Sequence, residues 1–189
     1  MCKFVITKTK KMTEPKFSTE IDIETPTMLE SIDYMDADDE LQAILAKIKA
    51  NTPHNSDING DRIKFLYTNK AKKEGGKYVI GELIARSEKE RAVYDAYDYV
   101  VIVYYPIWKE LDGNHKFIQL DKLLCGVDVE IKKTGEEAIK KAAPDSREYM
   151  DNMYYWGADN VLKSSEIVHL AATRYIESQK EAKKNAGKK

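Results

Sequence analysis

The sequence predicts a single α+β domain in which a small mixed or antiparallel sheet of three to four strands packs with helices. Two observations lead to this prediction: segments rich in β-branched and aromatic residues alternate with amphipathic helical segments, and a long helical segment follows near the C-terminus. The chain has 189 residues, of which 42% are hydrophobic, and this is enough for one sizeable core.

The composition argues against several classes of protein. Lys and Arg number 31 against 32 Asp and Glu, so a formal charge of −1 supplies no global field for nucleic acid or anionic membranes. Two cysteines predict reduced thiols rather than a disulfide framework. Since the chain shows neither a secretory leader nor an apolar run of membrane-spanning length, we expect a soluble intracellular protein without a membrane partner.

Residues 1–27 alternate apolar and polar side chains in two pieces, which predicts an extended N-terminal arm. Such an arm can add a strand to its own sheet or reach a neighbouring subunit, and the sequence does not separate these two options. Its candidate interface residues are Phe4, Val5, Phe17, Ile21 and Ile23. The alternative, that they complete the local core, has equal weight.

Residues 28–180 are expected to form the domain itself. Residues 27–50 follow a helical pattern, and the acids Asp36, Asp38, Asp39 and Glu40 near its start are explained by helix capping and the helix dipole rather than by metal binding. Residues 51–61 are rich in Asn, Asp, Pro and Gly, so we expect a surface loop. His54 lies in this loop without a second metal-type ligand at helical spacing.

Three strands are predicted at residues 63–68, 77–84 and 99–105, with a turn at residues 74–76. The third is almost continuously apolar and is the candidate central strand. Residues 87–97 carry an N-cap serine and an acidic first turn, which predicts a short helix between the second and third strands.

Four helical segments are predicted after Gly113. The first carries an apolar stripe and ends near Gly126, and the others cover residues 135–143, 145–155 and 160–180. Residues 181–189 have no apolar face, so we expect a flexible basic tail. Nucleic acid is expected as a partner only through this tail.

Twelve Tyr against four Phe suits half-buried surfaces and interfaces, because a tyrosine ring is apolar while its hydroxyl needs water or a partner. The aromatic cluster Tyr149, Tyr154, Tyr155 and Trp156 is therefore a second group of candidate interface residues. The alternative, that this cluster belongs to the local core, has at least equal weight.

One helical run points to a family. Residues 121–126 read Asp121, Lys122, Leu123, Leu124, Cys125 and Gly126, and similarity extends to KFLYT, to Gly81 and to YVVIVYYPIW. In these segments the chain resembles the phage-type metallopeptidase family, a zincin-like group whose helix carries a DHELCH run. The resemblance implies a zincin-like core at about residues 62–127.

The resemblance also implies that the zinc site of the family is lost. Lys122 and Gly126 stand where the family has its two histidines, and Leu123 stands in place of the glutamate that activates water. The Lys122 ammonium group, the hydrogen atom of Gly126 and the alkyl group of Leu123 can neither bind zinc nor activate water. We therefore expect no peptidase activity by this route, no metal and no cofactor.

The remaining candidates for chemistry are weak. Cys125 is expected to be a packed thiol, because no paired histidine is apparent in the sequence. His115 is expected in the first turn of its helix or in the loop before it. Glu166 and His169 form one ExxH pair on the last helix, and a single pair of this kind is seldom a metal site.

We therefore expect a non-catalytic structural or interaction protein, namely a phage virion component such as a neck, ring or tail subunit. Homo-oligomerisation, contact with other virion proteins, and a location first in the host cytoplasm and then in the virion follow from this expectation. A first alternative is a soluble phage-encoded inhibitor or adaptor that binds a host protein. A second is a residual metal-dependent hydrolase that uses Glu166 and His169.

Overall fold

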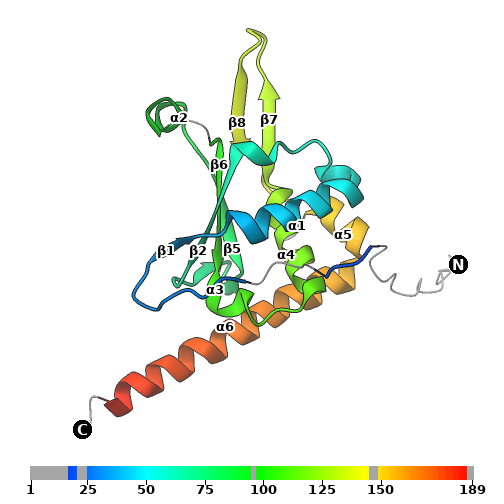
Figure 1. Cartoon of the computed structure of the whole chain (residues 1–189). Coiled ribbons are helices and arrows are strands. Elements are labelled where there is room, and N and C mark those ends of the chain that lie inside the picture. The colour runs from blue at the N-terminus through cyan, green and yellow to red at the C-terminus, as the bar shows by residue number, and fades with distance from the viewer. Residues whose placement is uncertain (1–16, 21–24, 95–96, 145–148, 187–189) are drawn as a thin grey trace, which may run out of the picture.

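The structure of the protein is a computed structural model that describes residues 17–20, 25–94, 97–144 and 149–186. It confirms the α+β class, with a four-stranded sheet, two separate two-stranded hairpins and a long C-terminal helix (Figure 1). In chain order the elements are β1 (Tyr34–Asp36), α1 (Asp38–Asn51), the 3-10 helices η1 (Pro53–Asn55) and η2 (Gly60–Arg62), β2 (Ile63–Thr68), β3 (Lys72–Glu74), β4 (Lys77–Val79), β5 (Gly81–Ala85), α2 (Glu88–Tyr94), β6 (Tyr99–Tyr104), α3 (Tyr105–Trp108), α4 (Gly113–Leu124), β7 (Val127–Ile131), β8 (Glu137–Lys141), α5 (Met150–Trp156) and α6 (Ala158–Ala186).

The four-stranded sheet is mixed, with the strand order β1-β2-β6-β5. β2 and β6 run parallel, so that Ile63 lies beside Tyr99, while β1 and β5 flank them in antiparallel pairings. The predicted strands at residues 63–68 and 99–105 are confirmed at the centre of the sheet, the second ending at Tyr104. Side chains of β6 are buried on one face, and on the other Val100 and Ile102 are half-buried and Tyr104 is buried, as expected of a strand covered on both sides.

The prediction of one strand at residues 77–84 is wrong, because the segment divides between two sheets. β4 pairs with β3, while β5 forms an edge of the main sheet. The chain crosses from one to the other at Ile80, whose carbonyl oxygen accepts a hydrogen bond of 2.6 Å from the Tyr104 N–H. A Cβ atom on Gly81 would lie 2.1 Å from the carbonyl oxygen of Ile102, so β5 can approach β6 this closely only with glycine there.

The turn at residues 74–76 is present, but it joins β4 to a short strand, β3, that the sequence pattern does not predict. Gly75 and Gly76 have φ values of +55° and +83°, a left-handed conformation that glycine adopts without a steric penalty. Two such residues in succession match the twist of a tight β-hairpin.

The prediction of a helix at residues 135–143 is also wrong. This segment contains β8, which pairs antiparallel with β7, and Gly135 forms the turn between them with φ +83°. Glu, Ala and Lys favour a helix locally, but pairing with a partner strand overrides this weak preference. Figure 1 shows the β7–β8 hairpin projecting from the body of the molecule.

The other helices follow the sequence more closely. α1 begins at Asp38 and not at residue 27, because β1 comes first and the Asp36 carboxylate accepts the Asp38 N–H at 2.9 Å. α2 opens with a reciprocal cap, in which Ser87 and Glu90 each accept the backbone N–H of the other. α5 starts at Met150, inside the predicted segment. α6 continues through Ala186, beyond the predicted end at residue 180.

Helix α4 occupies the centre of the helical layer, in contact with α1, α5, α6 and the edge strand β5. Its buried residues include Phe117, Leu120, Asp121 and Leu124, so its apolar stripe faces the core as predicted. Among the described residues, no helix combines the length and the apolarity that crossing a bilayer requires.

Candidate functional site

The carboxylate of Asp121 on α4 is the centre of the candidate site. Its side chain is 0% exposed. Its Oδ1 accepts a hydrogen bond of 2.8 Å from Asn55, and its Oδ2 accepts bonds of 2.7 Å from Asn152 and 2.8 Å from the Trp156 indole. His54 Nε2 lies 3.0 Å from Oδ2 and 3.2 Å from Oδ1. These donors compensate the lost hydration, which allows a carboxylate to be buried at this depth.

Three separate elements bring these side chains together. The η1 turn directly follows α1 and supplies His54 and Asn55, α4 supplies the carboxylate, and α5 supplies Asn152 and Trp156. The description of residues 51–61 as a plain surface loop is therefore incomplete, because Asn55 is buried and His54 is half-buried against α4. Sequence spacing could not reveal this contact.

Cys125 completes the group, one helical turn after Asp121. Its Sγ accepts a hydrogen bond of 3.8 Å from the Asn55 amide. A ring nitrogen of His54, a carboxylate oxygen of Asp121 and this sulfur all lie within 4.8 Å of one another. The sequence shows no histidine partner for Cys125, whereas the structure places one beside it.

The electrostatics of the group do not favour a cysteine nucleophile. Burial opposes the charged imidazole, but the hydrogen bond to Asp121 and the charges of Asp121 and Asp151 outweigh it and raise the pKa of His54. Burial and the Asp121 charge raise the pKa of Cys125, which keeps the thiol protonated at neutral pH. His54 Nε2 is directed at the Asp121 carboxylate, so among the described residues no hydrogen bond joins the sulfur to a general base.

The motif positions that follow Asp121 hold other contacts. Lys122 Nζ lies 3.2 Å from the Ser165 hydroxyl on α6, and Leu123 packs partly buried against the core. A Cβ on Gly126 would lie 2.9 Å from both Leu83 Cδ2 and the Tyr149 hydroxyl. A zinc ion has no ligand at positions 122 and 126, so the side chains present there do not fit the metal that the family name implies.

The ExxH pair on α6 is engaged in other contacts. Glu166 forms an exposed ion pair of 2.7 Å with Lys77. His169 stacks on Tyr78 and accepts the Tyr78 N–H at 3.0 Å through Nδ1, which docks β4 on α6. Within the described part of the chain, neither residue belongs to a group of three potential metal ligands. The position of His115 agrees with the prediction, since it lies in the first turn of α4.

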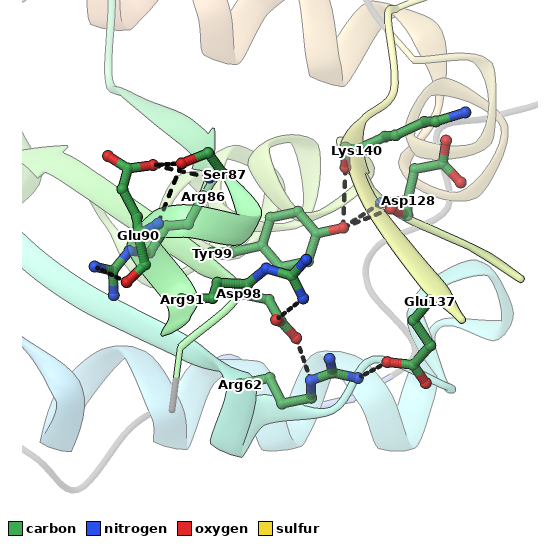
Figure 2. A network of polar contacts seen from close by, with 10 residues as sticks. All are labelled: Arg62, Arg86, Ser87, Glu90, Arg91, Asp98, Tyr99, Asp128, Glu137 and Lys140. Carbon is green, nitrogen blue, oxygen red and sulfur yellow. Dashed lines mark hydrogen bonds and ion pairs between the residues drawn. The ribbon is translucent and has the colours of Figure 1, made fainter. Parts of the chain in front are cut away.

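A pocket of about 460 Å³ lies beside the group, and His54 and Asn55 form part of its wall. Arg62, Asp98 and Glu137 also line this pocket, and Figure 2 shows the Arg62 guanidinium between the two carboxylates: it contacts Asp98 and lies 2.6 Å from Glu137. Arg91 adds a second contact to Asp98, at 3.2 Å. These charges neutralise one another, so they offer no strong field to a small ligand.

The base of the β7–β8 hairpin is held by one hydroxyl. Figure 2 shows Tyr99 Oη against both hairpin strands: it accepts the Asp128 N–H at 3.1 Å and lies 2.6 Å from the Asp128 carbonyl oxygen and 2.9 Å from that of Lys140. A hydroxyl has one proton, so it donates to one carbonyl at a time. β6 thereby holds a hairpin that would be marginally stable alone.

The candidate interface residues divide between core and surface. Phe17 lies with ring centroids 5.4 Å from Phe117 and 5.9 Å from Trp156, and Trp156 is buried, so these two candidates belong to the chain's own core. Tyr149 donates its hydroxyl to the Ala142 carbonyl at 2.8 Å, and Tyr155 packs edge-on against the His54 ring. Tyr154 is 93% exposed. Phe4, Val5, Ile21 and Ile23 lie outside the described residues.

Sequence reasoning missed a second buried carboxylate. Glu40 was assigned to the acidic first turn of its helix, but it is 1% exposed and accepts hydrogen bonds from four side chains. The donors are Thr25 at 2.9 Å, the Trp108 indole at 3.1 Å, Lys116 at 2.9 Å and the Tyr67 hydroxyl. Its position before the apolar stripe of α1 gave no signal of these long-range partners.

Comparison with known proteins adds one finding. Residues 32–179 match the model of the family described as "Putative phage metallopeptidase". No curated protein and no solved structure matches the chain.

Proposed function

The chain belongs to the phage metallopeptidase family, and we propose that it is a non-catalytic member that serves as a structural or interaction subunit of the phage particle. A neck, ring or tail component is the specific form of this proposal. What supports it is the turn at residues 122–126, where Lys122, Leu123 and Gly126 offer neither a zinc ligand nor a general base and have other contacts. Hydrolysis at this turn would need a metal-bound water and a general base. The side chains at positions 122, 123 and 126 can neither bind the metal nor act as the base.

Two projecting elements support an interaction role. The β7–β8 hairpin exposes 43% of Val129 and 73% of Ile131, two neighbours on one face of β7. The last turns of helix α6 extend away from the domain (Figure 1). Arms of this kind are suited to interlocking with other subunits, because they present surface that the domain itself does not cover.

The absence of peptidase activity is tested with the purified protein and a mixture of unstructured peptides, with zinc or manganese present. We expect no cleavage above the background of a heat-denatured sample. Cleavage that requires the metal and stops on addition of a chelator would overturn the non-catalytic part of the proposal.

The assembly role is tested by measuring the mass of the protein in solution and by mass spectrometry of purified phage particles. We expect a defined oligomer, and peptides of this chain in the particle.

The variant Val129→Lys with Ile131→Lys should lower the association constant at least about tenfold, because charges replace apolar contacts. Lys133→Ser, an exposed change at the hairpin tip, serves as the control. A monomer absent from particles would favour the adaptor alternative and overturn the assembly proposal.

A further inference from the structure

We infer that His54, Asp121 and Cys125 form a binding site for a transition-metal ion of the zinc type, separate from the motif positions 122 and 126. This departs from the sequence-based expectation of no metal, and it does not depend on the proposed function. With the Asn55 amide oxygen as a fourth ligand such a metal would be structural, because a site closed by four protein ligands keeps no position for a reactive water.

The geometry of the three ligand atoms carries the inference. They lie within 4.8 Å of one another, and the nitrogen of His54 is 3.0 Å from an oxygen of Asp121. Ligand atoms around a tetrahedral zinc ion, at bond lengths of about 2.0 to 2.3 Å, stand roughly 3.3 to 3.8 Å apart. Small side-chain rotations, without movement of α4, would close the group around an ion.

The spacing of two ligands is that of a helical metal site. Cys125 is the C-cap residue of α4, with helical backbone angles, and follows Asp121 by four positions, so the two side chains project from the same face of the helix, one turn apart. The third ligand, His54, comes from a turn packed against that face. Two ligands on a helix and one from a neighbouring element form a common basis for a zinc site.

The chemistry of the donor set selects the class of metal. One imidazole nitrogen, one thiolate sulfur and one carboxylate oxygen suit zinc or cobalt, whereas magnesium and calcium require oxygen ligands. The ion takes the place of the thiol proton of Cys125 and of any proton on His54 Nε2, and both protons leave to solvent. A divalent ion with one carboxylate and one thiolate is electrically neutral, which lowers the cost of burying the site.

A set of outer contacts already orients the carboxylate. Trp156 and Asn152 donate to Oδ2 of Asp121 and Asn55 donates to Oδ1, while His54 Nε2 lies 3.0 Å from Oδ2 and 3.2 Å from Oδ1. Hydrogen bonds of this kind fix the orientation of carboxylate ligands in metal sites. The Asn55 amide contacts both Asp121 and Cys125, so rotation of this amide would offer its oxygen as a fourth ligand.

Asn152 supplies an independent indication. It is 0% exposed, its amide nitrogen lies 2.7 Å from Asp121, and its Oδ1 has no hydrogen-bond partner among the described residues. A buried acceptor without a partner is costly and rare. Because Asn152 is bonded to Asp121, this acceptor lies beside the candidate site, where a bound cation would offset the cost of leaving it without a hydrogen-bond donor.

Entry for the ion is provided by the pocket described above, since His54 and Asn55 both line it. The side chain of His54 is 11% exposed, so its ring stands between the pocket and the buried carboxylate. An ion can therefore reach the group without unfolding of α4 or α5.

The test uses the full chain with Cys2→Ser, which leaves Cys125 as its single thiol. The protein is stripped of metal and titrated with cobalt(II) at mildly alkaline pH. We expect saturation at one cobalt per chain, with thiolate-to-cobalt charge-transfer absorption in the near ultraviolet and tetrahedral d–d bands in the visible. Zinc should displace the cobalt and raise the melting temperature.

Two variants and one control locate the site. Cys125→Ser should remove the charge-transfer band, and His54→Gln should weaken cobalt binding at least about tenfold. His115→Gln, which changes a histidine elsewhere on α4, should bind as the parent does. A folded parent without the charge-transfer band would overturn the inference, as would equal cobalt binding by the parent and Cys125→Ser.

Discussion

The imidazole of His54 and the carboxylate of Asp121 lie 3.0 Å apart, although 67 positions separate them in the chain. This contact joins the turn after α1 to the centre of α4, and Trp156 and Asn152 bring α5 to the same carboxylate. The Asp121 carboxylate thus joins α4 to α5 and to the turn that follows α1.

Replacement of that charge should be costly. With metal removed by chelator, Asp121→Asn is expected to lower the free energy of unfolding by about 3 kcal/mol. The new amide N–H₂ faces the donors that now bond to Asp121, and His54 loses its counter-charge. Urea denaturation followed by circular dichroism measures the change. Asp128→Asn, at an exposed position, should stay within about 0.5 kcal/mol, and an equal loss in both would contradict the central role of Asp121.

The cluster around Glu40 should show strong coupling to Lys116, because their 2.9 Å contact is almost fully buried. A double-mutant cycle with Glu40→Gln and Lys116→Met is expected to give a coupling free energy of at least about 1 kcal/mol. The pair Lys77 and Glu166 is exposed, and the same type of cycle there should give no measurable coupling. Independent, additive effects of the two substitutions at Glu40 and Lys116 would argue against the buried pair.

Tyr99→Phe should loosen the β7–β8 hairpin without disrupting the main sheet. The lost hydroxyl contacts backbone groups of both hairpin strands. A loss of about 1 kcal/mol in local opening free energy corresponds to roughly fivefold faster amide exchange in residues 127–131 and 137–141. Hydrogen exchange read by mass spectrometry measures this change. Tyr154→Phe, on a fully solvated side chain, is the matched control, and unchanged hairpin exchange in Tyr99→Phe would refute the prediction.

Two glycine substitutions should differ in cost because their neighbours differ. In Gly81→Ala the new methyl group would meet a backbone carbonyl oxygen at 2.1 Å, whereas in Gly126→Ala it would meet the ends of the Leu83 and Tyr149 side chains at 2.9 Å. Side-chain ends can move and backbone in a central strand cannot, so we expect a loss of about 1 kcal/mol for Gly126→Ala and about 3 kcal/mol or more for Gly81→Ala. Urea unfolding of both variants gives the comparison, and the reverse order would contradict the packing described.

Prediction from sequence succeeded where a local pattern is strong enough to decide the structure. The continuous apolar run of β6 and the stripe of α4 both appear at the predicted positions. The failures lie where local preference is weak. Residues 135–143 contain good helix formers, yet β8 forms because β7 and the Tyr99 hydroxyl provide partners for its backbone.

Only part of the candidate site can be predicted from the sequence. The inability of Lys122, Leu123 and Gly126 to hold zinc can be predicted from the chain itself, because it depends on residue type alone. The role of His54 is not visible there, since a lone histidine in a polar loop looks the same whether or not a carboxylate faces it in the folded protein.

The sequence by itself determined the α+β class, the central strands, the amphipathic helix α4 and the lack of zinc-binding side chains at positions 122, 123 and 126, because these depend on local periodicity and on side-chain chemistry. Only the tertiary structure decided that His54, Asp121 and Cys125 meet, and that Glu40 is buried beside Lys116. A buried charge is stabilised by donors from several elements remote in sequence, and their convergence is a property of packing rather than of any one segment.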